Sequence, residues 1–260
     1  MKRSPGVRLC ATVTVSALSF ALATGCSDGG SKNSSDKGSA HKALSTAELR
    51  KLIVTKADLP GYEVGPVTEA RAKRITTDNA DCVPLTRVMS GLPPTDAPAS
   101  TDRMATENAR KQPSARPTSL EDMDEGEFEE AMRKSLDRDV TTVTLASYDG
   151  DGAEQAMKSL SAAVKACAGG FTGRQAGAEA RFTKVAEEKP AGGGDASVAF
   201  AATAKEDQSD GGGAAPVHAE VDRHGSTVSV YFTTNLGAMM ARKAYTVTPA
   251  VVRAQEARLK

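Results

Sequence analysis

Residues 217–232 read VHAEVDRHGSTVSVYF, in which apolar and polar side chains alternate on both sides of His224-Gly225. This alternation is typical of two strands with unlike faces, and a short Gly-containing break between them predicts a hairpin. With His224 and Gly225 in the turn, the apolar pairs are Val221 with Val228, Ala219 with Val230 and Val217 with Phe232. The opposite face pairs His218 with Tyr231, Glu220 with Ser229 and Asp222 with Thr227. We expect the apolar face to join the core and the polar face to meet solvent.

Further elements extend this hairpin into a mixed fold. Residues 140–147, 180–186 and 196–204 read as strands, and residues 152–166 carry an apolar stripe at helical spacing. Shorter helices are expected after Ser45, after Cys82 and after Thr248. We predict an α+β fold, in which an antiparallel sheet of four to six strands has helices packed on one face.

The N-terminal segment reads as an export signal. Lys2, Arg3 and Arg8 precede an uncharged apolar run at residues 9–22, about 14 residues long and too short to span a bilayer. The run ends in Ala21-Leu22-Ala23-Thr24-Gly25-Cys26, which resembles the cleavage site of bacterial lipoproteins, with acylation of Cys26. The expected organisation is a signal peptide at 1–25, a flexible stalk at 26–43 and one extracytoplasmic domain at 44–260. Plain secretory cleavage nearby is the alternative.

Charge and composition exclude some partners. The chain has 33 basic and 33 acidic residues, and loss of the leader removes three basic residues, which leaves a net charge of 3 negative. A chain without basic excess is a poor match for nucleic acid, so we expect no such partner. Aromatic residues make up 4% and Trp is absent, which disfavours surfaces that stack sugars or bases.

Cys82 and Cys167 are the cysteines left once Cys10 leaves with the leader and Cys26 carries lipid. Outside the cytoplasm such a pair favours a disulfide, and two buried free thiols are the alternative. Neither cysteine has a ligand at zinc-site spacing, so we expect no metal.

Several short motifs mimic functional sites. Ser34-x-x-Lys37 lies in the stalk without the further motifs of penicillin-binding proteins, and residues 149–160 lack the glycine and final glutamate of a calcium loop. Residues 192–194 and 211–213 are glycine triplets without the Lys-Ser/Thr of a phosphate loop, so we interpret them as hairpin linkers.

Two groups of titratable residues remain. Residues 121–130 hold seven carboxylates, which a solvated helix with basic residues at its end explains. His218, Glu220 and Tyr231 could form a proton-transfer cluster, but the solvent face of an antiparallel sheet explains them equally. His218 and His224 are too few for a metal site.

The chain resembles actinobacterial secreted lipoproteins and, loosely, the PknH-like extracellular sensor domain family. Four segments carry the resemblance: Ala57-Asp58-Leu59-Pro60-Gly61, Asp81-Cys82-Val83-Pro84-Leu85, Cys167-Ala168-Gly169-Gly170-Phe171 and Val251-Val252-Arg253-Ala254-Gln255. Over residues 44–260 it implies helices packed on an antiparallel sheet, a cleft that accepts a ligand, and no catalysis. It assigns no ligand residues.

The expected function is therefore non-enzymatic. We expect a ligand-binding or sensor-like module held to the outer face of the cell membrane by lipid on Cys26. Its partner would be a small ligand or an envelope protein, with no cofactor and no catalytic residue. A structural envelope protein is the alternative, followed by a hydrolase that uses carboxylates or His218.

Overall fold

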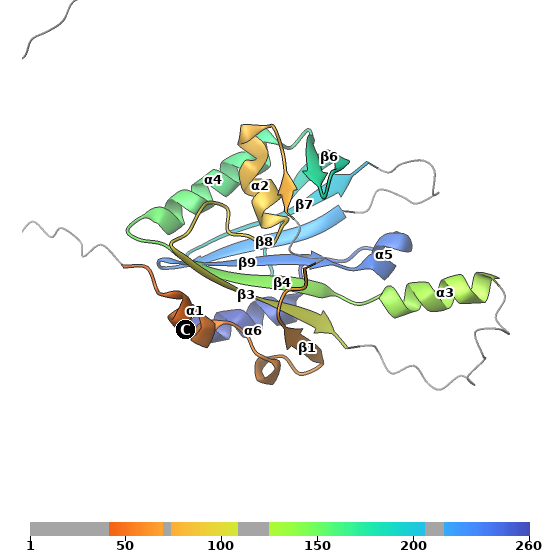
Figure 1. Cartoon of the computed structure of the whole chain (residues 1–260), viewed down its shortest axis with the longest axis horizontal. Coiled ribbons are helices and arrows are strands. Elements are labelled where there is room, and N and C mark those ends of the chain that lie inside the picture. Colours follow the sequence, from red (N-terminus) through yellow and green to blue (C-terminus); the bar gives the residue numbers. More distant parts are fainter. Residues whose placement is uncertain (1–41, 70–73, 109–124, 206–215) are drawn as a thin grey trace, which may run out of the picture. The chain divides into compact units, whose positions relative to one another are not determined.

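A single antiparallel sheet of nine strands organises the described part of the chain, residues 42–69, 74–108, 125–205 and 216–260 of the computed structural model (Figure 1). The strands are β1 (Tyr62–Gly65), β2 (Ile75–Thr76), β3 (Ala99–Glu107), β4 (Val140–Ser147), β5 (Phe171–Gln175), β6 (Ala178–Glu188), β7 (Ala196–Ala204), β8 (Pro216–His224) and β9 (Thr227–Thr234). Their order is β1-β3-β4-β9-β8-β7-β6-β5-β2. The predicted count of four to six strands is wrong, because β1, β2, β3 and β5 lack a clear apolar alternation.

Helices cover both faces of this sheet. They are α1 (Thr46–Leu52), α2 (Val83–Val88), α3 (Glu125–Leu136), α4 (Gly152–Ala166), α5 (Leu236–Met240) and α6 (Pro249–Leu259), with short 3-10 turns at Lys56–Asp58 and Ala80–Cys82. In Figure 1, α2 and α4 lie on one side of the strands, and α1 and α6 lie on the other. The α+β class is confirmed, whereas the prediction of helices on one face is wrong. Within the described residues, none of the helices has the length and apolar character needed to cross a membrane.

The β8–β9 hairpin forms with the predicted division of faces but in a different register. His224 pairs with Thr227, and Val221 pairs with Val230 rather than Val228. Gly225 therefore occupies the first central position of the turn, where its φ of 59° is one that glycine adopts without strain. Because the slip is two residues, every side chain stays on its predicted face.

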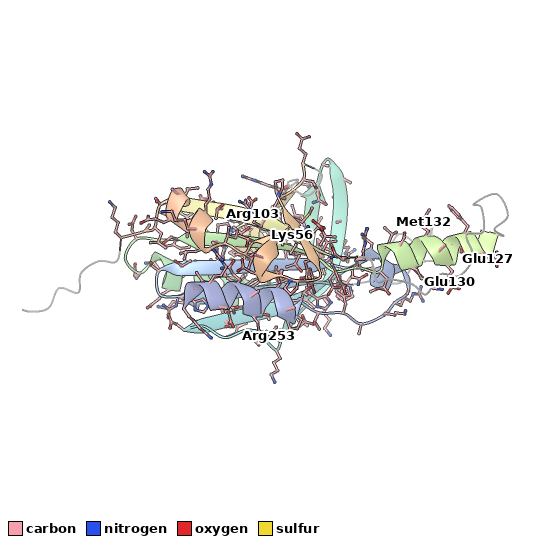
Figure 2. The ribbon with its side chains drawn as sticks, turned by 90° about the horizontal axis from the view of Figure 1, so that it is seen from below. Lys56, Arg103, Glu127, Glu130, Met132 and Arg253 are labelled. Carbon is pink, nitrogen blue, oxygen red and sulfur yellow. A yellow bond between two sulfur atoms is a disulfide. The ribbon has the colours of Figure 1, made fainter. Side chains whose placement is uncertain are left out.

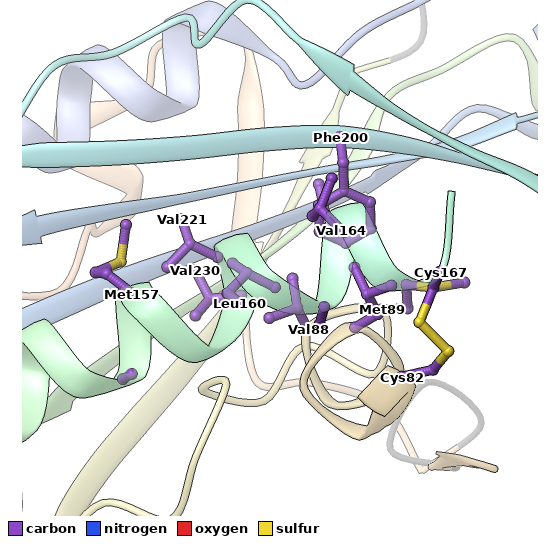
Figure 3. Packing of buried hydrophobic residues seen from close by; sticks show 14 of the residues in the cluster. Cys82, Val88, Met89, Met157, Leu160, Val164, Cys167, Phe200, Val221 and Val230 are labelled. Carbon is purple, nitrogen blue, oxygen red and sulfur yellow. A yellow bond between two sulfur atoms is a disulfide. The ribbon is translucent and has the colours of Figure 1, made fainter. Parts of the chain in front are cut away.

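The larger core lies between α4 and the apolar face of the hairpin. Leu160 and Val164 of α4 are buried beside Val221, Val230 and Phe200 (Figure 3). The helix has the predicted bounds, because its alanines, leucine and valine recur every three or four residues. The predicted strand β7 also places Phe200 in this core.

The disulfide joins Cys82 to Cys167, with 5.9 Å between the two Cα atoms (Figure 3). Both cysteines are buried, one at the start of α2 and the other directly after α4. The bond therefore fixes these two helices together on the same face of the sheet.

The second core lies on the opposite face, under α1 and α6. Its buried apolar residues are Leu49, Ile53, Val54, Leu59, Ala105, Val143, Leu145, Tyr231, Val247, Val251 and Val252. Gln255 of α6 ties the two helices, because its side-chain oxygen accepts from Val54 N and its nitrogen donates to Leu52 O, both at 2.9 Å. Figure 2, seen from this side, shows α6 in front of the strands, with Arg253 at its exposed surface.

Helix α3 begins within the acidic run and is solvated as predicted. Glu127 and Glu130 are exposed (Figure 2), and Glu130 pairs with Lys134 at 2.7 Å. Residues 121–124, Cys26, Ser34, Lys37 and the 211–213 triplet lie outside the described residues.

Removing the disulfide with Cys82→Ser and Cys167→Ser should lower the free energy of unfolding. The bond joins cysteines 85 residues apart. In the chain-entropy model its loss raises the conformational entropy of the unfolded chain, which lowers the free energy of unfolding by about 4–5 kcal/mol. Urea unfolding of the full chain measures this, with the unreduced wild type as reference. Equal midpoints for the two proteins would contradict the structural role of the bond.

Candidate functional site

The polar face of the β8–β9 hairpin is buried, and the expectation that it meets solvent is wrong. Its buried members are His218, Glu220, Asp222, Thr227, Ser229 and Tyr231, all at most 5% exposed. Helix α6 and the connection between β6 and β7 lie over this face. At Gly192 in that connection, a Cβ atom would lie 2.5 Å from Val252 Cγ1 of α6 and 2.9 Å from Asp222 Oδ2. The pattern was ambiguous because a strand's alternation does not reveal whether a second layer covers its polar side.

Three successive backbone amides of this connection donate to buried carboxylates. The amides of Ala191 and Gly192 each donate to one oxygen of Glu220, both at 2.8 Å. The amide of Gly193 donates to Glu256 Oε1 of α6. Two side chains from distant parts of the chain thus hold one glycine-rich loop in place. The predicted role of residues 192–194 as a hairpin linker is confirmed, since β6 and β7 pair on either side of them.

Asp222 completes an acidic cluster with Glu220 and Glu256. It is fully buried, and neither oxygen makes a hydrogen bond of normal geometry to a described residue, although Ser197 and Glu220 lie close enough to influence its pKa. Burial, together with the charges of Glu220 and Glu256, raises the pKa of Asp222 to about 7, against the lowering effect of the Ser197 side chain. Burial also raises the pKa of Glu220, against the lowering effect of its two amide donors. At neutral pH the carboxyl group of Asp222 is therefore partly protonated.

Glu188 is oriented separately, by His218. Nδ1 of His218 lies 2.8 Å from Glu188 Oε2, and the imidazole ring meets the edge of Tyr245 with centroids 4.5 Å apart. Tyr245 is fixed in turn because its hydroxyl donates to Pro216 O at 2.7 Å. Nε2 of His218 is buried without a partner in the described chain.

A cavity of about 380 Å³ lies between Glu188 and Glu220. It is lined by Glu188, Lys189, Ala191, Ala199, Glu220, Thr246, Val247 and Pro249. The pairing of β6, β7 and β8 explains it, because Glu188 pairs with Ala199 and Ala199 pairs with Glu220. The small Ala199 side chain leaves a hollow between two longer ones on neighbouring strands.

The depth of the cavity follows from burial. Ala199, Glu220 and Val247 are buried at its base, whereas Lys189 and Thr246 are exposed at its mouth. Three larger hollows of 470–510 Å³ exist on described residues, but none of their lining residues is a buried carboxylate. The cavity between Glu188 and Glu220 is therefore the candidate site.

Only some of the titratable residues named from the sequence lie near this cavity. His218 and Glu220 lie on the same buried face beside this cavity, whereas His224 lies at the hairpin turn. No group of three or more His, Cys, Asp or Glu side chains in the described ranges could hold a metal ion. Glu188, Asp222 and Glu256 were not predicted as site residues. The only signal for Glu256 in the sequence is its position next to Gln255, on the face of α6 expected to be buried.

Comparison with known proteins gives little more. No family model and no curated protein matches the chain. The crystal structure of the extracellular domain of PknH from Mycobacterium tuberculosis is similar at 12% identity, covering 83% of this chain and 99% of that chain with a TM-score of 0.46. A likeness at that level carries no argument about the site.

Gly192→Ala should destabilise the site, and Gly193→Ala should not. A methyl group at residue 192 would lie 2.6 Å from Glu256 Oε1 and 2.5 Å from Val252, whereas residue 193 has open space around it. We expect a loss of about 1–3 kcal/mol in the free energy of unfolding for Gly192→Ala. Chemical denaturation of both variants checks this, and equal effects would refute the close packing of the loop.

Asp222→Asn should change how stability depends on pH. The carboxyl group has an ordinary pKa of 3.8 and a pKa of about 7 in the folded chain, so the folded state binds more protons between these values. Stability must then fall as pH rises from about 4 to 7, by up to roughly 1.4 kcal/mol per unit. Glu220, whose pKa is also raised, adds a slope of the same sign.

The asparagine variant removes the Asp222 part of this slope. We expect it to unfold at a higher temperature than the wild type at pH 8 and to differ little at pH 4. Thermal unfolding across this range measures both, with Asp102→Asn at an exposed position of β3 as the control. Parallel profiles for the wild type and Asp222→Asn would count against the buried, protonated carboxyl.

Proposed function

We propose that this chain is a non-enzymatic, extracytoplasmic module that binds a small ligand in the cavity between Glu188 and Glu220. The supporting observation is a hollow whose mostly apolar wall converges on two carboxylates that the protein itself orients. A few fixed polar groups in an apolar hollow are typical of small-molecule sites. A sensor-like role follows if occupancy of the cavity moves the loop that forms its wall.

The position of Asp222, outside the cavity lining, favours binding over hydrolysis. Asp222 and Glu256 do not line the cavity, and both lie against Gly192 of the loop that contributes Ala191 to the cavity wall. A general acid must come within hydrogen-bond reach of its substrate. The carboxyl group with the pKa of about 7 therefore lies out of reach of a solute in the cavity.

A structural envelope protein remains the second candidate, because large apolar side chains are exposed together on two helices. Phe128 and Met132 of α3 and Leu236 and Met240 of α5 are 41–57% exposed. At Gly237 of α5 a Cβ atom would lie 2.5 Å from Arg133 O of α3, so the two helices are in contact. Exposed apolar groups of this kind suit a protein partner.

The anchor and the location rest on the sequence. A basic start, a short apolar run and Cys26 support export, cleavage after Gly25 and acylation of Cys26. The diacylated residue would attach the module to the outer face of the cell membrane, since two acyl chains suffice for stable anchoring.

Native mass spectrometry tests the binding function. The full chain purified from its own membrane should retain a small molecule, and Ala199→Leu should release it, because the larger side chain fills the base of the cavity. Ala178→Leu, at an exposed position of β6, is the matched control and should retain the ligand. A wild-type chain that carries no bound mass and takes up no added small molecule would remove the proposal.

Metabolic labelling tests the anchor. A labelled fatty acid should enter the wild-type protein, and Cys26→Ser should abolish both the label and membrane association. The variant removes the thiol that would carry the acyl group. If Cys26→Ser kept its label, or if residues 1–25 persisted on the cell-associated protein, the anchor would be wrong.

A further inference from the structure

The charges around the cavity between Glu188 and Glu220 are mainly negative. The carboxyl groups of Glu188 and Glu220 line it, and those of Asp222 and Glu256 lie close to Gly192, next to the lining residue Ala191. Lys189 is the cationic lining residue among those described, and its side chain is exposed at the mouth. A bound anion would therefore meet repulsion at the buried end of the cavity, where screening by solvent is weakest.

The carboxylate of Glu220 keeps hydrogen-bonding capacity toward a ligand. Each oxygen accepts one backbone amide, from Ala191 or Gly192, and a carboxylate oxygen accepts two hydrogen bonds. The Glu188 carboxylate accepts from His218 through one oxygen and leaves the other for a ligand. Both groups are thus oriented before any ligand arrives, and both offer acceptors.

Buried polar atoms beside the cavity also lack partners. Both oxygens of Asp222 and Nε2 of His218 have none in the described chain, although the two residues are 0% and 4% exposed. Leaving such atoms unpaired costs free energy, and it is most costly for charged groups. A cation in the adjacent cavity would favour the ionised form of Asp222, whose carboxyl group is otherwise partly protonated at neutral pH.

We infer that the cavity takes a small organic cation, an ammonium group on a short apolar body. This inference rests on the proposed function. The ammonium donates to Glu220 and Glu188, which stand on either side of Ala199, and the body lies against Ala191, Val247 and Pro249. An ammonium group has three donors and no acceptor, which matches two carboxylates that need donors.

Three probes of similar size and different charge test the ligand class. Butylammonium, butyrate and 1-butanol are titrated into the full chain, with binding followed by ligand-observed NMR. We expect butylammonium to bind at least tenfold more tightly than either of the others. Tighter binding of butyrate or butanol would overturn the cation class and leave the proposed binding function standing.

Charge-neutral variants locate the interaction. Glu188→Gln and Glu220→Gln should each weaken butylammonium binding about tenfold, a loss consistent with one charge-assisted hydrogen bond. Glu187→Gln is the matched control, because Glu187 is exposed and does not line the cavity. Glu220→Gln could disturb the loop, because Glu220 accepts the amides of Ala191 and Gly192. Glu188 makes no such bond to the loop, so Glu188→Gln still tests the inference in that case. Unchanged binding in Glu188→Gln, or no binding of butylammonium to the wild type, would overturn the inference.

If the wild type retains a small molecule in native mass spectrometry but ignores butylammonium, the cation class alone fails. If it neither retains a molecule nor binds any probe, the proposed function fails with it.

Discussion

The structure around the candidate site depends on three adjacent backbone amides, those of residues 191–193, meeting two buried glutamates. Glu220 comes from the sheet and Glu256 from the last helix, so these hydrogen bonds join two distant segments to one loop. Without the amides, the glutamates would be buried and unpaired, at a cost of several kcal/mol. The loop, the helix and the polar face of β8 are therefore mutually dependent, and the cavity exists because they meet.

The two sides of the sheet differ in how they are stabilised. Apolar packing and a disulfide hold α2 and α4 to one side. On the other side α6 packs over a smaller apolar core, and its Glu256 reaches the buried carboxylates around Gly192. Since the carboxyl groups with raised pKa, Asp222 and Glu220, lie on the second side, we expect conformational sensitivity to pH or ligand there and rigidity on the disulfide-bonded side.

Sequence patterns were sufficient where side chains interact with near neighbours. The bounds of α4 followed from its apolar stripe, and the pairing of Cys82 with Cys167 followed from elimination and compartment. The apolar face of the hairpin also followed, although its register did not, because either His224-Gly225 or Gly225-Ser226 satisfies the same alternation. Patterns among residues close in sequence therefore predicted α4 and the apolar face of the hairpin, which form the larger core.

The site was not predictable in this way, because it depends on register and on a second layer. Glu188 and Glu220 are brought to either side of Ala199 only by the pairing of three strands. The burial of Asp222 requires α6 to cover a face that reads as solvated. The most direct test is carbon-13 NMR of the Asp222 and Glu220 carboxyl groups between pH 3 and 9. The account predicts that Asp222 titrates near pH 7 and that the amide signals of residues 191–193 shift with it, whereas a midpoint near 3.8 with static amides would contradict it.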